Sequence, residues 1–247
     1  MKADPGAQGR LLDLQATDTA MAQLDHRRAT LPETATARSL QADRARAAER
    51  VIAADTVLSD ADLELKKAEQ DLVPVRERLA RNETRVADGS VGDPKALQGL
   101  LEEIQHLKRR IDELEDSQLE AMERLDEARA VADRAQEGKK GVEDELRGVL
   151  AVRETRLGEI AAERDVLERE RHVIAAAVPA DLLALYTRIA DKSGGVGAAK
   201  LQHGRCGGCQ LEANNADMNA YRAAAPDEVL RCEECGRILI RTADSGL

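Results

Sequence analysis

Apolar residues recur at heptad spacing through much of the chain, with charged residues between them. From Glu33 to Val86 one row of positions seven apart holds leucine and valine, and a neighbouring row holds mainly alanine. The first row is Val51, Leu58, Leu65, Leu72, Leu79 and Val86, and the second is Ala47, Ala54, Ala61, Ala68 and Val75. This pattern predicts a long coiled-coil helix with a side that allows close helix approach. Pro74 lies inside the pattern, where we expect a bend rather than a break.

A second helical arm follows a short turn. The turn contains Gly89 and Gly92 and ends in Asp93-Pro94, a pair typical of a helix cap and first helical residue. The heptad then resumes with Leu97, Leu100, Ile104, Leu107, Ile111 and Leu114. A change of phase near residues 138–141 predicts a stutter in this arm.

The lengths of the helical segments indicate how they pair. An amphipathic segment over 10–31 precedes the first arm, and together with 33–87 it nearly equals the number of residues in 94–177. We therefore expect an antiparallel hairpin spanning residues 1–178, with its tip near 88–94.

The composition changes after Pro179. A short helix is predicted over 180–190, followed by a glycine-rich stretch and short strands at 229–230 and 238–240. We therefore treat 179–247 as a second domain. Because it holds few apolar residues, it needs a covalent or metal staple to fold.

The staple is a set of four cysteines. Cys206-Gly-Gly-Cys209 and Cys232-Glu-Glu-Cys235 are separated by 22 residues. Two such pairs predict one structural Zn²⁺ held by four thiolates, with strands at Gln210-Leu211 and 238–240 completing a ribbon. A redox dithiol or an iron centre is the alternative. His203 is the nearby side chain that could alter the metal shell, although a solvated loop histidine is the simpler interpretation.

Composition narrows the classes of function. Aromatic residues make up 1% of the chain and the net charge is −10, which argues against a thick core and against a chain-wide attraction to nucleic acid. There is no phosphate loop, activated nucleophile or paired acid, so we expect no enzyme activity and no small-molecule substrate. The absence of a secretory or membrane-spanning segment predicts a cytoplasmic protein without a membrane partner.

Several segments resemble a known bacterial family. These are the run 101–123, Pro179-Ala180-Asp181-Leu182-Leu183, Gly195-Val196-Gly197-Ala198-Ala199 and both cysteine pairs. They are similar to the coiled-coil zinc-ribbon proteins of the FlgZ-like and CdsZ-like type. The resemblance implies a mainly α fold, in which a long antiparallel coiled-coil hairpin precedes a small C-terminal β zinc ribbon. It also implies binding of RNA or other nucleic acid and of partner proteins such as a sigma factor.

Basic side chains near the cysteines are the candidates for a nucleic-acid contact. They are Lys200, Arg205, Arg231, Arg237 and Arg241. Residues 179–247 nevertheless hold eight basic and nine acidic side chains, so any attraction to phosphate must come from one face. Only Tyr186 and Tyr221 could stack on a base.

Charged residues near the tip are candidates for binding a protein partner. They are Lys108, Arg109, Arg110, Asp88 and Asp93. For the basic run we favour the simpler interpretation, a solvated helix face paired with carboxylates such as Glu103 and Glu113. The leading functional hypothesis is a regulatory adaptor that binds nucleic acid through the ribbon and protein through the hairpin. The alternatives are a protein-only scaffold or chaperone, and a DksA-like regulator that inserts carboxylates into RNA polymerase.

Overall fold

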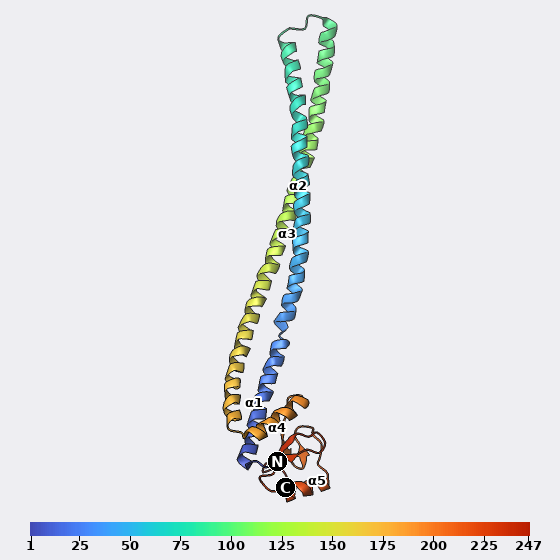
Figure 1. Ribbon diagram of the computed structural model, residues 1–247. Coiled ribbons are helices and arrows are strands. Elements are labelled where there is room, and N and C mark those ends of the chain that lie inside the picture. Colours follow the sequence, from blue (N-terminus) through green and yellow to red (C-terminus); the bar gives the residue numbers. More distant parts are fainter. The chain divides into compact units, whose positions relative to one another are not determined.

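The computed structural model describes all 247 residues and contains five helices and four short strands. The helices are α1 (Pro5–Ala29), α2 (Pro32–Ala87), α3 (Pro94–Ala176), α4 (Ala180–Lys192) and α5 (Asn215–Ala223). The strands are β1 (Ala198–Gln202), β2 (Arg205–Cys206), β3 (Leu230–Arg231) and β4 (Ile238–Ile240). The predicted fold class, a long helical hairpin followed by a small strand region with clustered cysteines, is confirmed (Figure 1).

Two compact units divide the chain. One, here called the head unit, combines Met1–Thr34 with Ala151–Leu247, and the other, the hairpin unit, is Ala35–Leu150. The sequence division at residue 178 thus differs from the grouping by contacts, because α1 and the end of α3 contribute to the head unit. No helix is long and apolar enough to cross a membrane.

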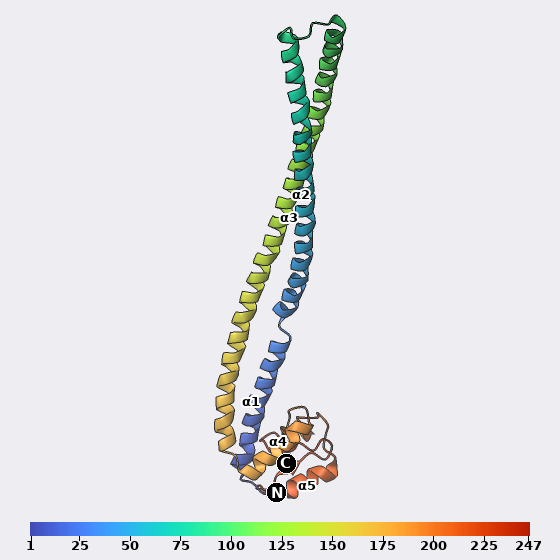
Figure 2. The same ribbon diagram turned by 45° about the horizontal axis from the view of Figure 1, so that its top comes forward.

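The hairpin unit is an antiparallel pair made by α2 and α3, which lie side by side in both ribbon views (Figures 1 and 2). Each core layer pairs a residue of α2 with a residue of α3, and the residue numbers increase along α2 while they decrease along α3. The layers contain Leu40 with Leu146, Ala61 with Leu125, and Leu72 with Leu114. α2 runs without a break through Pro74, as expected.

The stutter in α3 lies later than the glycines predict. Its half-buried and buried positions alternate in steps of three and four past residues 138–141. Two steps of four then follow, from Val149 to Arg153 and from Arg153 to Leu157. Lys139 and Val142 are half-buried at the positions that continue this spacing, so the phase is kept past the glycines.

The head unit is built around a four-stranded sheet with the order β2-β1-β4-β3. β1 pairs antiparallel with β2 and parallel with β4, and β3 pairs antiparallel with β4. Alternating residues of the strands face two different cores. Leu11 and Leu14 of α1 and Leu182 and Tyr186 of α4 cover one face, on which Ile238 is fully buried. On the other face, α5 packs Met218 and Tyr221 near the cysteines.

Several local features differ from the sequence prediction, which placed no strand at β1 or β2 and began β3 one residue early. α1 begins at Pro5 rather than near residue 10, because the Asp4 carboxylate accepts a hydrogen bond from the Ala7 amide and caps the helix. Residues 210–211 form no strand; only Glu212 makes a single bridge, to Arg205. Helix α5, which the apolar pattern did not reveal, is capped by Asn214, whose side chain accepts from the amides of Ala216 and Asp217.

Candidate functional site

The four cysteine sulfurs form one cluster in the head unit. Cys206 ends β2, and Cys232 directly follows β3, so the sheet brings the two pairs together. All four Sγ atoms lie within 4.8 Å of one another. The Sγ atoms of Cys206 and Cys235 are 3.8 Å apart, as are those of Cys209 and Cys232. These separations are far longer than a disulfide bond, and they match the spacing of about 3.8 Å expected for sulfurs around a tetrahedral zinc.

The surroundings of the sulfurs shift the pKa values of the thiols in different directions. Burial raises the pKa of the Cys206 thiol and raises the pKa of Cys232 to about 12, so these groups favour the neutral form without a positive partner. Burial acts on Cys235 in the same direction, but hydrogen bonds from Arg237 and neighbouring cysteines outweigh it and bring its pKa to about 7. The Gly208 amide also donates to Cys206 Sγ over 3.4 Å. A C4 centre of this kind holds one structural Zn²⁺.

The residue that follows the last cysteine differs between the two cysteine turns. In the second turn the residue after the last cysteine is Gly236, with φ +70°, and in the first it is Gln210, with φ +64°. Glycine adopts this left-handed conformation freely, whereas a residue with a Cβ loses about 1–2 kcal/mol there. One Cys-x-x-Cys pair is followed by glycine and the other by glutamine. This difference is visible in the sequence and could have singled out Gln210, but the prediction of the metal centre used only the spacing of the cysteines.

Three of the five candidate nucleic-acid contacts are engaged within the head unit itself. Arg237 donates to the carbonyls of Val196 and Ser193, and Arg231 donates to the Gly236 carbonyl. Arg241 donates to the carbonyls of Glu228, Ala224 and Ala225. These guanidinium groups therefore satisfy loop and helix-end carbonyls. Lys200 and Arg205 are exposed, and the nearest carboxylate to Arg205 is Glu212 at 3.4 Å.

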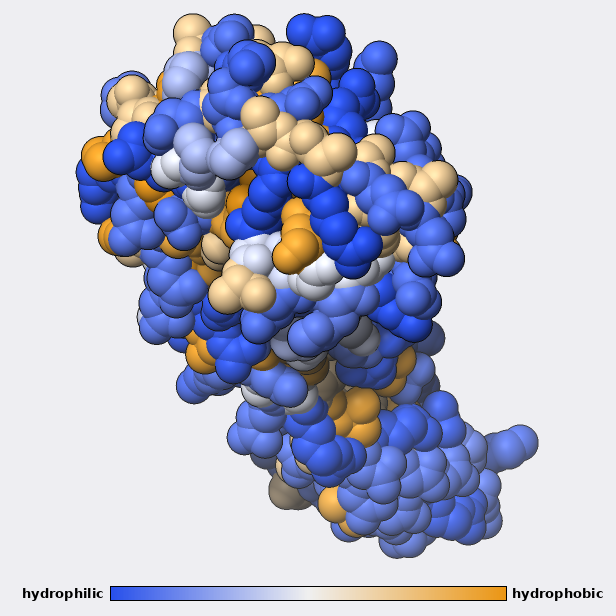
Figure 3. All heavy atoms as spheres, turned by 90° about the horizontal axis from the view of Figure 1, so that it is seen from below, coloured by the Kyte–Doolittle hydropathy of each residue, from blue (hydrophilic) through white to orange (hydrophobic).

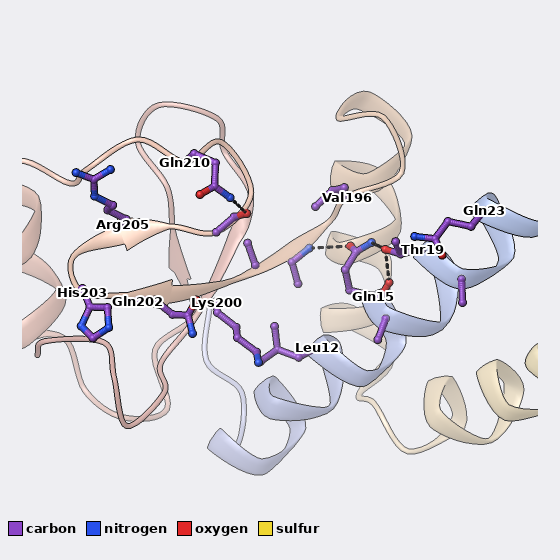
Figure 4. Close-up of a pocket in the computed structure, with 15 residues that line it drawn as sticks. Leu12, Gln15, Thr19, Gln23, Val196, Lys200, Gln202, His203, Arg205 and Gln210 are labelled. Atoms are coloured by element: carbon purple, nitrogen blue, oxygen red, sulfur yellow. Dashed lines mark hydrogen bonds between the residues drawn. The ribbon is translucent and has the colours of Figure 1, made fainter. Parts of the chain in front are cut away.

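Lys200 and Arg205 line a groove between α1 and the β1–β2 hairpin, shown in Figure 4. The groove has a volume of about 800 Å³. Small residues such as Ala16, Ala20 and Ala199 form its apolar part. Its polar side chains are Gln15, Thr19, Gln23, Lys200, Gln202, His203, Arg205 and Gln210, and none of the lining residues is acidic.

The face of the molecule in Figure 3 is largely hydrophilic, with hydrophobic residues in small separate patches.

Gln15 holds the groove together from its buried position on α1. Its Oε1 accepts from the amides of Gly197 at 2.7 Å and Ala198 at 3.3 Å. Its Nε2 donates to the Gly195 carbonyl at 2.9 Å. Every polar atom of this side chain is thus used to attach α1 to the start of β1. Nothing in the heptad pattern distinguishes Gln15 from the polar residues around it, so the sequence prediction does not include it.

The two tyrosines are both buried. Tyr186 donates to the Asp18 carboxylate at 2.7 Å, and that carboxylate also pairs with Arg171 at 2.5 Å. Tyr221 donates to the Arg231 carbonyl. Their exposed fractions are 1% and 6%, so neither ring is available to stack on a base.

The candidate partner-binding residues lie in the hairpin unit. Lys108 pairs with Glu83, and Arg110 pairs with Glu113, as the simpler interpretation expects. Glu103 pairs with Arg78 rather than with the basic run. Arg109 is exposed.

The two tip carboxylates have different surroundings. Asp93 caps α3, because its carboxylate accepts from the amides of Lys95 and Ala96. Asp88 is exposed in the turn.

The helical hairpin and the four-sulfur centre define a coiled-coil zinc-ribbon protein. Residues 14–194 match the family described as the CT398-like coiled coil hairpin domain, and residues 205–239 match the C4-type zinc ribbon domain. The chain belongs to the CT398-like family. A narrower assignment to the FlgZ-like or CdsZ-like proteins stays a prediction.

Relatives of nearly the same length support this assignment. Protein Rv2229c of Mycobacterium tuberculosis H37Rv is 33% identical over 241 residues, covering 98% of each chain. A solved structure from Mycobacterium smegmatis is 31% identical, with a TM-score of 0.82 over 98% of this chain and 100% of that one. CT398 from Chlamydia trachomatis shares the fold at 17% identity, with a TM-score of 0.62 over 96% and 98%.

Proposed function

We propose that the chain is a non-catalytic adaptor, in which the head unit recognises a partner protein and the hairpin unit supplies a second interaction surface. The descriptions of both matching families name a structural module, a coiled coil hairpin in one and a zinc ribbon in the other. Four thiolates fill a tetrahedral zinc shell, which leaves no position for a substrate or an activated water. The zinc therefore shapes a binding surface.

The hydrogen bonds that the arginines make within the head unit favour a protein partner over nucleic acid. Arg231, Arg237 and Arg241 donate to backbone carbonyls of the head unit, and Arg205 pairs with Glu212, so four of the five candidate cations have a partner within the head unit. Few unpaired cations and a single exposed imidazole in the groove, that of His203, make a weak single-strand site, because such sites combine several phosphate contacts with base stacking. Protein recognition needs neither feature.

A polymerase-channel role has less support. That hypothesis uses Asp88 and Asp93 as free carboxylates at the tip, but Asp93 accepts two hydrogen bonds as the cap of α3. A cytoplasmic location remains part of the proposal. It is supported by four cysteines that cluster as thiols around a metal site rather than as disulfides, which fits a reducing compartment.

Copurification with a matched variant tests the adaptor role. The tagged, zinc-loaded full chain and its Lys200→Glu/Arg205→Glu variant are isolated from cells of the source organism, with and without nuclease. We expect partner proteins that still copurify after nuclease treatment and that do not copurify with the variant. In parallel, labelled RNA and DNA are titrated at several salt concentrations. Tight nucleic-acid binding that weakens steeply with salt, together with nuclease-sensitive partners, would contradict a protein-binding head.

A further inference from the structure

Two residues of the groove hold an unfavourable backbone conformation. Throughout the chain, His203, with φ +48°, and Gln210, with φ +64°, are the two residues other than glycine with positive φ. Both line the same groove. Residues in such conformations persist where the surrounding structure requires them, often at functional sites.

The surroundings explain how each conformation is held, but not why a side chain is present. His203 and Gly204 form the two-residue turn between β1 and β2, a turn that favours Asn-Gly or Gly-Gly. Gln210 occupies the position that Gly236 fills in the second cysteine turn. Its Nε2 donates to the Gly207 carbonyl, and the rest of the side chain remains exposed. Glycine would satisfy the backbone at both positions.

The groove chemistry selects a ligand with negative charge and backbone-like polar groups. Lys200 and Arg205 are exposed cations in the wall, and no lining residue is acidic. Arg205 pairs with the exposed Glu212 outside the lining over 3.4 Å, an ion pair that a ligand carboxylate can replace. Amide side chains at Gln23, Gln202 and Gln210 can both donate and accept, as a peptide backbone does. We propose that this groove binds an extended acidic peptide segment, and that Gln210 is kept in place of glycine to contact it.

Nucleic acid is the less suitable occupant. An oligonucleotide would find two cations and one exposed imidazole, that of His203, since both tyrosines are buried elsewhere in the head unit. Strong single-strand sites combine several stacking rings with several phosphate contacts. An acidic peptide needs only the cations for its carboxylates, the amides for its main chain and the alanines for its small side chains. This inference rests on the proposed protein-binding role of the head unit.

The test begins with selection of a ligand. A displayed library of short random peptides is panned on the zinc-loaded full chain, after depletion on the Lys200→Glu/Arg205→Glu variant. We expect enriched peptides rich in Asp and Glu. Their affinity, measured by fluorescence anisotropy, falls about tenfold when the acids are changed to amides.

Substitutions then separate a contact role from a structural one. Gln210→Gly is expected to weaken the selected peptide about tenfold, while the thermal midpoint of the head unit stays equal or rises because strain is relieved. Gly236→Gln is the matched control: it places the same side chain in the other cysteine turn, lowers the midpoint and leaves the affinity unchanged. Lys200→Gln should also weaken the selected peptide, whereas Lys192→Gln, which removes a charge outside the groove, should leave the affinity unchanged.

Three outcomes would overturn the inference. They are the absence of enrichment over the variant, unchanged affinity in Gln210→Gly, and stronger binding of an oligouridine or oligothymidine than of the selected peptide. If peptides fail while nuclease-resistant partners still depend on Lys200 and Arg205, the groove inference fails and the adaptor role stands. If peptides bind but no partner copurifies, the adaptor role is the one that fails.

Discussion

The head unit and the hairpin unit are stabilised in different ways. In the hairpin unit small apolar layers such as Ala61, Leu125 and Ala128 repeat along two helices. In the head unit single contacts join distant parts of the sequence, as Gln15 does with Gly197. A single substitution should therefore act locally in the hairpin unit and throughout the sheet and loops of the head unit.

Loss of zinc is expected to separate the two units most clearly. Cys206→Ser, or chelation of the native chain, should remove on the order of 10 kcal/mol of folding free energy from the ribbon. The hairpin unit should stay helical, because α2 and α3 contain no cysteine. Metal analysis, far-ultraviolet circular dichroism and hydrogen exchange resolved by region measure this difference. Reloading with zinc is the control, and a hairpin unit that melts on chelation would contradict the comparison.

The same substitution should have opposite signs in the two units. A Cβ on Gly197 would lie 2.6 Å from the Tyr186 carbonyl oxygen and 2.7 Å from its ring, so Gly197→Ala overpacks a buried contact. We expect a loss of about 1–3 kcal/mol. Gly148 is exposed on α3 with nothing within 4 Å of the added atom, and Gly148→Ala should gain about 1 kcal/mol. Denaturation followed by regional hydrogen exchange checks both signs, and equal signs would refute the distinction.

Two asparagines sharpen the comparison further. Asn82 is a buried core residue of the hairpin unit whose Nδ2 has no hydrogen-bond partner, so Asn82→Leu should stabilise that unit by about 1 kcal/mol. The same substitution should make the helix register less specific, because a buried Asn restricts alternative pairings of the two helices. Asn214 caps α5 in the head unit, so Asn214→Leu should cost about 1 kcal/mol. Urea unfolding of both variants gives the two values, and a destabilised Asn82→Leu would show that its amide is satisfied.

Alkaline pH should destabilise the head unit through its two buried tyrosines, with no such effect at neutral pH. Burial, followed by the hydrogen bond to Asp18, raises the pKa of Tyr186 well above its usual value, and burial raises the pKa of Tyr221 to about 12. Because the folded pKa values exceed the unfolded value of about 10, their contribution is complete below that pH. It is lost as the pH rises further.

Thermal unfolding between neutral and alkaline pH measures this loss. The Tyr186→Phe/Tyr221→Phe variant should flatten the decline in the head unit. The hairpin unit, which has no tyrosine, is the internal control. An undiminished alkaline decline in the double variant would assign it to other groups.

The periodic parts of the fold could be predicted because their signal is local. Leucine and alanine rows indicated α2 and α3, the spacing of Cys206, Cys209, Cys232 and Cys235 indicated the metal centre, and the strand at Ile238–Ile240 was placed correctly. The start of α1 was missed because the cap at Asp4 lies outside the apolar stripe. Helix α5 was missed because its stability comes from Asn214 and from packing of two side chains.

The amino-acid sequence by itself determined the helical arms, the turn between them and the four sulfur ligands, because heptads and cysteine pairs act over a few residues. Only the tertiary structure decided which basic side chains remain exposed, since backbone carbonyls distant in sequence engage Arg237 and Arg241. It also decided that Gln15 attaches α1 to β1 and that Lys200, Arg205 and Gln210 share one groove. Such surfaces arise from contacts between segments far apart in the chain, and no short sequence pattern records those contacts.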